Sequence, residues 1–323
     1  MSTGLVLGKF LPPHKGHEFL INYAKERSDK LYIIIDCVSD NVIPAKIRAS
    51  WMKKICPMAS VLTLQKILPQ YPHEADDFWE QWQEELQKIL PEKIDFVFAS
   101  ETYGFKLAEI LGAKFEMVDL ERKTVEISAS KIRKNPFKYW DFISDTARPF
   151  FVKKVCIFGP ESTGKSTLTE KLAEHFNTAY VEEFARQVIE ARGGNINYDD
   201  MTTIAKGHND AVSKGLLQAD KLLFVDTDAI TSKIWSLKLF GKYPKILDDI
   251  IEKADYDLYL LLDTDVPWVD DIVRYFPENR KEFFETCEAE LKKYNKNYKI
   301  IRGDFDKRFE KAVETVEENF YAW

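Results

Sequence analysis

The sequence has few cysteines and no excess of basic residues, and both shortages narrow the class of protein. None of its four cysteines, at positions 37, 56, 156 and 287, belongs to a C-x-x-C pair, so we expect reduced, buried thiols. The formal net charge of the 323 residues is −7, whereas dedicated nucleic-acid-binding domains are usually basic. We therefore expect no nucleic-acid partner.

Long apolar runs, repeats and low-complexity tracts are lacking as well. The N-terminus enters Gly4-Leu5-Val6-Leu7 without a basic leader, and no segment is long enough to span a bilayer. These features predict a cytoplasmic protein without a membrane segment. The length is enough for two domains of ordinary size.

The stretch Gly159-Pro-Glu-Ser-Thr-Gly-Lys-Ser-Thr167 organises the second half, because it matches the phosphate-binding pattern G-x-x-x-x-G-K-[ST]. The pattern requires a strand before it and a helix after it, and we expect these over 155–158 and 168–176. Backbone N–H groups and the helix N-terminus would then enclose the phosphates of ATP. Lys165 is expected to reach the β- and γ-phosphates, and Ser166 to bind Mg²⁺. The predicted ATP-binding residues here are Gly159, Glu161, Ser162, Thr163, Gly164, Lys165, Ser166 and Thr167.

The first half contains another glycine turn, and this one carries two histidines. A strand at 5–7 runs into Gly8-Lys-Phe-Leu-Pro-Pro-His-Lys-Gly-His17, which an amphipathic helix follows. Three-residue spacing at a helix start lets His14 and His17 face one pocket. The pocket would lie at the carboxyl end of a strand, where open α/β sheets bind ligands. Two solvent-exposed loop histidines are the alternative interpretation.

This turn resembles the G-x-F-x-P-x-H-x-G-H signature of the nucleotidyltransferase superfamily. The second signature of that family, I-S-x-T-x-x-R, is similar to Ile127-Ser-Ala-Ser-Lys-Ile-Arg133, in which Ser130 replaces the threonine. The resemblance implies adenylyl transfer, in which an acceptor phosphate attacks the α-phosphorus of ATP and pyrophosphate leaves. The ATP-binding residues that it implies are Gly8, Lys9, Phe10, His14, His17, Ser128, Ser130 and Arg133.

Charged residues follow three further apolar strands of the second half. Glu183 follows 178–181 and Asp226 follows 222–225; either could take the proton of an acceptor hydroxyl, and Asp226 could instead hold Mg²⁺. After 258–262, Pro267-Trp-Val269 with Arg274 and Arg280 has the pattern of a lid whose arginines contact phosphoryl oxygens, although ordinary surface charge is the alternative. The predicted substrate-binding residues are Glu183, Arg186, Asp226, Asp228 and Trp268. The predicted catalytic residues of the whole chain are His14, His17, Arg133, Lys165, Glu183 and Asp226.

Continuous apolar strands that alternate with helices indicate parallel sheets covered on both sides. We predict an α/β protein of two domains with mostly parallel sheets. Residues 1–148 would form a Rossmann-like nucleotidyltransferase and residues 149–323 a P-loop kinase, with Pro149 ending any helix before it. No N-K-x-D tetrapeptide is present, which favours ATP over GTP.

Together the two halves resemble the NadR family, which joins a nicotinamide mononucleotide (NMN) adenylyltransferase to a ribosylnicotinamide kinase. The resemblance covers nearly the whole chain. It implies that ATP phosphorylates nicotinamide riboside to NMN, and that AMP is then attached to give NAD and pyrophosphate. The first strand begins within the first few residues, so the helix-turn-helix repressor domain of some members is not expected. A homo-oligomer is compatible with the sequence.

Two other functions remain open at this stage. A fused phosphopantetheine adenylyltransferase and dephospho-CoA kinase combines the same two classes of site, although Glu183-Phe-Ala-Arg186 and Pro267-Trp-Val269 match the NadR pattern better. A nucleotide-sensing regulator would bind ATP or NAD without turnover. Because a sensor would tolerate the loss of Lys165, Ser166 and Asp226, their presence favours an enzyme.

Overall fold

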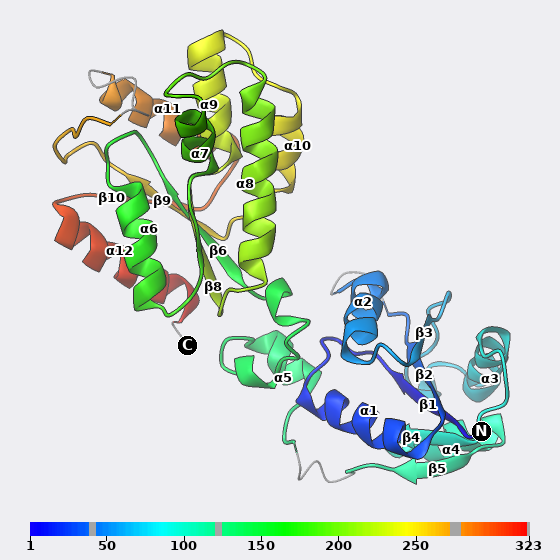
Figure 1. Ribbon diagram of the computed structural model, residues 1–323. Coiled ribbons are helices and arrows are strands. Elements are labelled where there is room, and N and C mark those ends of the chain that lie inside the picture. Colours follow the sequence, from blue (N-terminus) through cyan, green and yellow to red (C-terminus); the bar gives the residue numbers. More distant parts are fainter. Residues whose placement is uncertain (39–42, 120–124, 272–278, 322–323) are drawn as a thin grey trace. The chain divides into compact units, whose positions relative to one another are not determined.

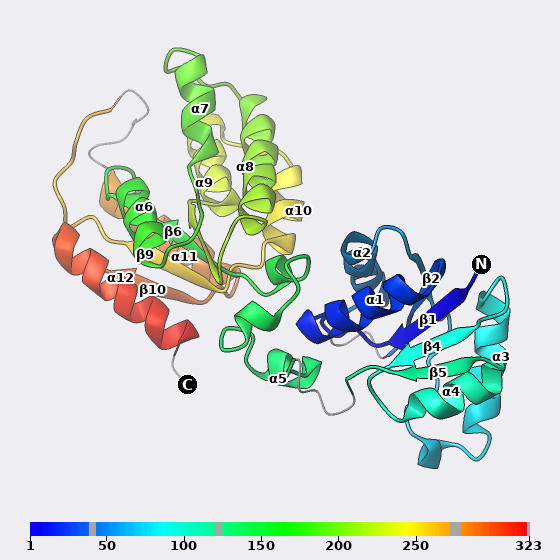
Figure 2. The same ribbon diagram turned by 60° about the horizontal axis from the view of Figure 1, so that its bottom comes forward.

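The computed structural model describes residues 1–38, 43–119, 125–271 and 279–321. The chain divides into two compact units, Met1–Phe150 and Phe151–Trp323. Each unit is built on a five-stranded sheet whose strands pair in parallel (Figures 1 and 2). The predicted fold class, an α/β protein with two parallel sheets, is therefore confirmed. None of the helices in the described ranges is both long enough and apolar enough to cross a bilayer.

The first unit has the strand order β3-β2-β1-β4-β5, with β1 at the centre. Its strands are β1 (Thr3–Gly8), β2 (Lys30–Ile35), β3 (Ser60–Thr63), β4 (Phe96–Ala99) and β5 (Lys114–Met117). Its α-helices are α1 (Lys15–Arg27), α2 (Ala45–Ile55), α3 (Phe78–Ile89), α4 (Tyr103–Leu111) and α5 (Ala129–Lys134), with 3₁₀ turns at Pro72–Glu74, Trp140–Phe142 and Arg148–Phe150.

Alternating residues of the central strands explain why this sheet is covered on both sides. Leu5 and Leu7 of β1 pack against α3 and α4, whereas Val6 packs against α1 and α2. Figure 2 shows these two helix pairs on opposite sides of the sheet. Both faces are therefore apolar, as the continuous apolar runs predicted.

The second unit has the strand order β10-β9-β6-β8-β7. Its strands are β6 (Lys153–Phe158), β7 (Tyr180–Val181), β8 (Leu222–Asp226), β9 (Leu258–Leu262) and β10 (Tyr298–Ile301). Its helices are α6 (Lys165–His175), α7 (Phe184–Ala191), α8 (Asp200–Leu216), α9 (Ala229–Phe240), α10 (Ile246–Lys253), α11 (Arg280–Lys293) and α12 (Phe305–Phe320). Figure 1 shows α6 and α12 on one side of the sheet and α8, α9 and α10 on the other.

Two details of the predicted elements needed correction. The edge strand β3 was not predicted, because its residues are partly exposed and form only a short apolar stretch. Helix α6 begins at Lys165 rather than at 168, so Lys165 and Ser166 belong to its first turn. This places both side chains where the helix dipole favours an anion.

Candidate active sites

A cavity of about 830 Å³ opens at the carboxyl ends of β1 and β4 in the first unit. It lies where the strand order reverses, which is the usual ligand site of an open α/β sheet. The cavity is lined by all the ATP-binding residues that the family resemblance implied for the first half of the chain, namely Gly8, Lys9, Phe10, His14, His17, Ser128, Ser130 and Arg133.

The two histidines are held in a fixed relationship at the start of α1. His14 is the N-cap residue, and its backbone N–H donates to Nδ1 of His17 over 3.3 Å. The imidazole rings stack with centroids 3.8 Å apart. A Cβ at Gly16 would lie 3.1 Å from the ring of His14, so glycine gives this ring its space. Because Nδ1 of His17 accepts a hydrogen bond, Nε2 carries the hydrogen of the neutral ring.

Arg133 joins the second motif to the histidine turn. Its guanidinium donates to the carbonyl oxygen of Leu11, 122 positions earlier, and to Oγ of Ser130 over 3.2 Å. Ser128 caps α5, since its Oγ accepts from the backbone N–H of Lys131 at 3.3 Å. The fold thus brings together two motifs that are far apart in the sequence.

The lining of this cavity also includes residues that sequence reasoning missed as site residues. Asp36 directly follows β2 and is 4% exposed, and its burial raises the pKa of the carboxyl to about 6, although the charge of Lys9 opposes the shift. Tyr71, Trp79 and Trp82 also line this cavity. An apolar strand ending in aspartate was a usable signal for Asp36, because the same signal identified Asp226.

The second unit holds a cavity of about 270 Å³ around the phosphate-binding loop. The loop backbone has φ values of +133° at Gly159, +56° at Ser162 and +85° at Gly164. A Cβ at Gly159 would lie 2.8 Å from the carbonyl oxygen of Leu262, so this position requires glycine. The predicted residues that line the cavity are Glu161, Ser162, Thr163, Gly164, Lys165, Ser166, Thr167, Glu183 and Arg186.

Asp226 lies beside this loop at the end of β8. It is 1% exposed, and Oγ of Ser166 donates to its Oδ2 over 2.6 Å. Its Oδ1 is buried and has no hydrogen-bond partner within the described part of the chain. Burial, reinforced by the charge of Glu183, raises the pKa of Asp226 to about 7. A serine hydroxyl next to a carboxylate with an unused oxygen fits a divalent cation, which prefers oxygen ligands.

Asp228, two positions further on, is used within the fold. Its Oδ1 accepts from the backbone N–H groups of Ile230 and Thr231, at 2.9 and 3.2 Å, and so caps α9. Its Oδ2 accepts from the hydroxyl of Tyr259 at 2.8 Å. Both oxygens are therefore engaged in a residue that is 2% exposed, and its role in substrate binding stays a prediction.

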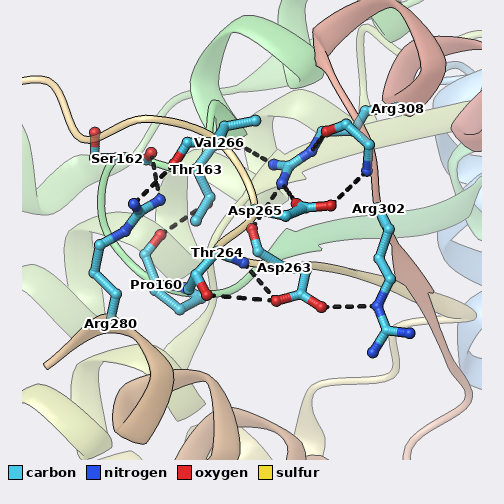
Figure 3. A network of polar contacts seen from close by, with 11 residues as sticks. Pro160, Ser162, Thr163, Asp263, Thr264, Asp265, Val266, Arg280, Arg302 and Arg308 are labelled. Atoms are coloured by element: carbon cyan, nitrogen blue, oxygen red, sulfur yellow. Dashed lines mark hydrogen bonds and ion pairs between the residues drawn. The ribbon is translucent and has the colours of Figure 1, made fainter.

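Two arginine side chains link the phosphate-binding loop to the segment after β9 (Figure 3). Arg280 donates to the carbonyl oxygens of Val266 and Ser162, at 2.9 and 3.0 Å. Arg308, which is 2% exposed, donates to that of Thr163 at 2.7 Å. Two guanidinium groups thus hold adjacent loop carbonyls. This contact of Arg308 with the loop was not predicted from the sequence.

The predictions for Trp268, Arg186 and Arg274 have different outcomes. Trp268 does not line the cavity, and its Nε1 donates to Asp270 over 2.6 Å. Arg186 lines the cavity while it pairs with Asp271 at 2.9 Å. Arg274 lies outside the described residues, so its predicted contact with phosphate stays a prediction.

The fold and these two cavities define a class of protein: an α/β chain with one candidate site of nucleotidyltransferase type and one of P-loop type. Residues 154–308 match a family model described as an AAA domain. The chain is 32% identical to the trifunctional NAD biosynthesis/regulator protein NadR of Escherichia coli (strain K12). The match covers 98% of this chain and 83% of the length of that protein. The chain therefore belongs to the NadR family.

Two solved structures share the fold of the whole chain. One is a NadR protein in complex with NR, with a TM-score of 0.81, and the other is a NadR protein in complex with NAD and AMP-PNP, with a TM-score of 0.82. In both comparisons the identity is 24%, and the match covers 100% of this chain and 97% of the other.

Proposed function

We propose that this chain is a bifunctional enzyme of NAD biosynthesis. Its second unit phosphorylates nicotinamide riboside with ATP, giving NMN. Its first unit transfers the adenylyl group of a second ATP to NMN, giving NAD and pyrophosphate. The observation that carries the proposal is the presence of a separate cavity in each unit, each lined by its own phosphate-binding motif, in a chain that belongs to the NadR family.

In the kinase unit, the phosphate-binding loop and Lys165 position the γ-phosphate of ATP. Ser166 and Asp226 would hold Mg²⁺, which offsets phosphate charge when bound. Glu183 lines the cavity and is half-buried, whereas Asp226 is 1% exposed and accepts from Ser166. These differences support Glu183 as the group that takes the proton of the 5′-hydroxyl.

In the transferase unit, catalysis requires no covalent intermediate. A phosphate oxygen of NMN attacks the α-phosphorus, and the protein must hold the reactants in line and stabilise the charge that develops. The ring of His17 has its Nδ1 engaged by His14, so Nε2 is the nitrogen that donates to a phosphate oxygen. Lys9 and Arg133 supply positive charge at the same cavity.

The proposal is tested with the purified full chain, ATP and Mg²⁺. Nicotinamide riboside should yield NMN and then NAD, and supplied NMN should yield NAD without the first step. Phosphopantetheine and dephospho-CoA serve as comparison substrates. Turnover of these two without turnover of riboside or NMN would assign the chain to the coenzyme A alternative. Tight ATP binding with no product from any acceptor would indicate a sensor.

A further inference from the structure

One residue that lines the kinase cavity has a buried hydroxyl group that the fold leaves unused. Thr231, in the first turn of α9, lines the cavity and is 4% exposed. Its Oγ1 has no hydrogen-bond partner among the residues that the structure describes. An unsatisfied buried polar group costs on the order of 1–3 kcal/mol. A hydroxyl group of a bound ligand would remove this cost by supplying the missing partner.

A neutral imidazole lines the same cavity from α8. His208 is 8% exposed, and its Nε2 lies 3.2 Å from the carbonyl oxygen of Thr227. Because a carbonyl only accepts hydrogen bonds, Nε2 carries the hydrogen and Nδ1 has the free electron pair. Burial lowers the pKa of this imidazole to about 4, so the ring is an uncharged acceptor near pH 7.

Both groups border the turn that follows Asp226, next to the phosphate end of the cavity. His208 holds the carbonyl of Thr227, whose φ is +67°, and Thr231 donates its backbone N–H to Asp228. Apolar side chains make up much of the remaining wall, including Ile189, Met201, Ile204, Trp235 and Leu239. Consider a nucleoside that has its 5′-oxygen at the γ-phosphate of ATP and its base against the apolar side chains. Its sugar would then lie beside Thr231 and His208.

We propose that Thr231 and His208 bind the ribose hydroxyls of the kinase substrate and thereby select a ribonucleoside over its deoxy analogues. The inference rests on the proposed function. A threonine hydroxyl both donates and accepts, and the free nitrogen of His208 accepts, so the pair matches a diol in hydrogen-bonding capacity. Neither group carries a charge, and a sugar hydroxyl needs none.

The test combines substrate analogues with substitutions in the full chain. We would measure kcat/KM for nicotinamide riboside and for its 2′-deoxy and 3′-deoxy forms. The wild-type protein should favour the riboside over at least one analogue by about tenfold or more, which is the effect of roughly 1.4 kcal/mol of binding. Thr231→Val should lower kcat/KM for the riboside by a similar factor and reduce the preference toward unity.

Three further variants separate a sugar contact from a structural role. Thr231→Ser keeps the hydroxyl and should retain the preference. His208→Gln keeps an amide N–H for Thr227 but replaces the free ring nitrogen with an amide oxygen at a different position, so the preference should fall. Thr315→Val is the matched control, because this buried threonine of α12 lies outside the cavity lining. Its hydroxyl donates to the carbonyl oxygen of Lys311 at 2.7 Å. The preference should not change in that variant.

Several outcomes would overturn the inference while leaving the proposed function intact. One is a wild-type protein that phosphorylates riboside and both analogues equally well. Another is a Thr231→Val protein that loses activity toward all three substrates by the same factor. The melting temperature gives an independent readout, because Thr231→Val removes a group without a partner in the fold and should not lower it. Absence of riboside phosphorylation by the wild type would overturn both proposals.

Discussion

The guanidinium of Arg308 donates a 2.7 Å hydrogen bond to the carbonyl oxygen of Thr163, which lies 145 positions earlier in the chain. The same side chain donates to the carbonyls of Gly303 and Asp263, both at 2.8 Å, and pairs with Asp265 (Figure 3). This buried guanidinium therefore connects the phosphate-binding loop with the segments that follow β9 and β10. Thr163 stands between two residues with positive φ, so this hydrogen bond helps to keep the phosphate-binding loop in shape before ATP arrives.

We predict that Arg308→Lys impairs the kinase selectively. An ammonium group cannot reproduce the planar fork of donors that Arg308 uses, so the loop loses part of its support. We expect kcat/KM for ATP in riboside phosphorylation to fall by about 10- to 100-fold, corresponding to one or two charged hydrogen bonds. Steady-state kinetics with NMN supplied should show unchanged adenylyl transfer.

The control for this variant is Arg302→Lys, because the side chain of Arg302 is 67% exposed and pairs with Asp263 on the surface. Exposed ion pairs contribute little, about 0–1 kcal/mol. Equal losses in the two variants would contradict the role assigned to Arg308.

Lys165→Ala should abolish riboside phosphorylation and leave NAD formation from supplied NMN largely intact. Lys165 lines the kinase cavity and donates to the carbonyl of Pro160 at 2.8 Å, so its ammonium is held within the phosphate-binding loop. The two half-reactions are measured separately by following NMN and pyrophosphate. Loss of both activities in a folded variant would show that the two sites are not independent.

His17→Ala should have the opposite effect. Removal of one preorganised donor to a developing phosphate charge typically costs on the order of 10² to 10³ in rate, so adenylyl transfer should fall by that factor. Riboside phosphorylation should be unaffected, and NMN should accumulate when riboside and ATP are supplied. The matched comparison is the exposed His73, which lies outside the lining of the transferase cavity; His73→Ala should leave adenylyl transfer unchanged.

Asp36 should make the stability of the protein depend on pH in a defined direction. Its pKa in the fold is about 6, against an ordinary value of 3.8, so between these values the folded state binds more protons than the unfolded state. Stability therefore falls as pH rises from about 4 to about 6, by up to about 3 kcal/mol for a shift of this size.

Asp36→Asn removes this titrating group and should remove its contribution, whereas the contribution of Asp226, which has the same sign, should stay. Denaturant unfolding of the full chain at pH 4.5 and pH 7.5 measures the difference. The variant should gain stability relative to wild type at the higher pH, because an amide needs no charge to be buried. An identical pH dependence in both proteins would rule out Asp36 as its source.

Sequence reasoning predicted the features that depend on neighbouring residues. The strands β6, β8 and β9 are buried on both faces and appear in the sequence as apolar runs. The phosphate-binding loop and the histidine turn have fixed spacings, so their positions could be read directly. Both parallel sheets followed from the alternation of strands and helices.

Features that depend on distant contacts could not be predicted in the same way. Arg308 is one of several charged residues in α12, and its local sequence does not indicate that it reaches Thr163. Thr231 follows an apolar residue at a helix start, and its unused hydroxyl becomes visible only when the surrounding side chains are placed. Trp82 shows a related limit, because helical spacing identifies a core face but not a cavity beneath it.

The long separation of Thr163 and Arg308 has a consequence for the newly made polypeptide. Synthesis proceeds at roughly 5–20 residues per second, so the phosphate-binding loop is made on the order of ten seconds before Arg308. Until Arg308 is made, the nascent kinase unit would therefore contain a phosphate-binding loop that lacks this hydrogen bond. The transferase half, made first, is complete in sequence throughout that interval.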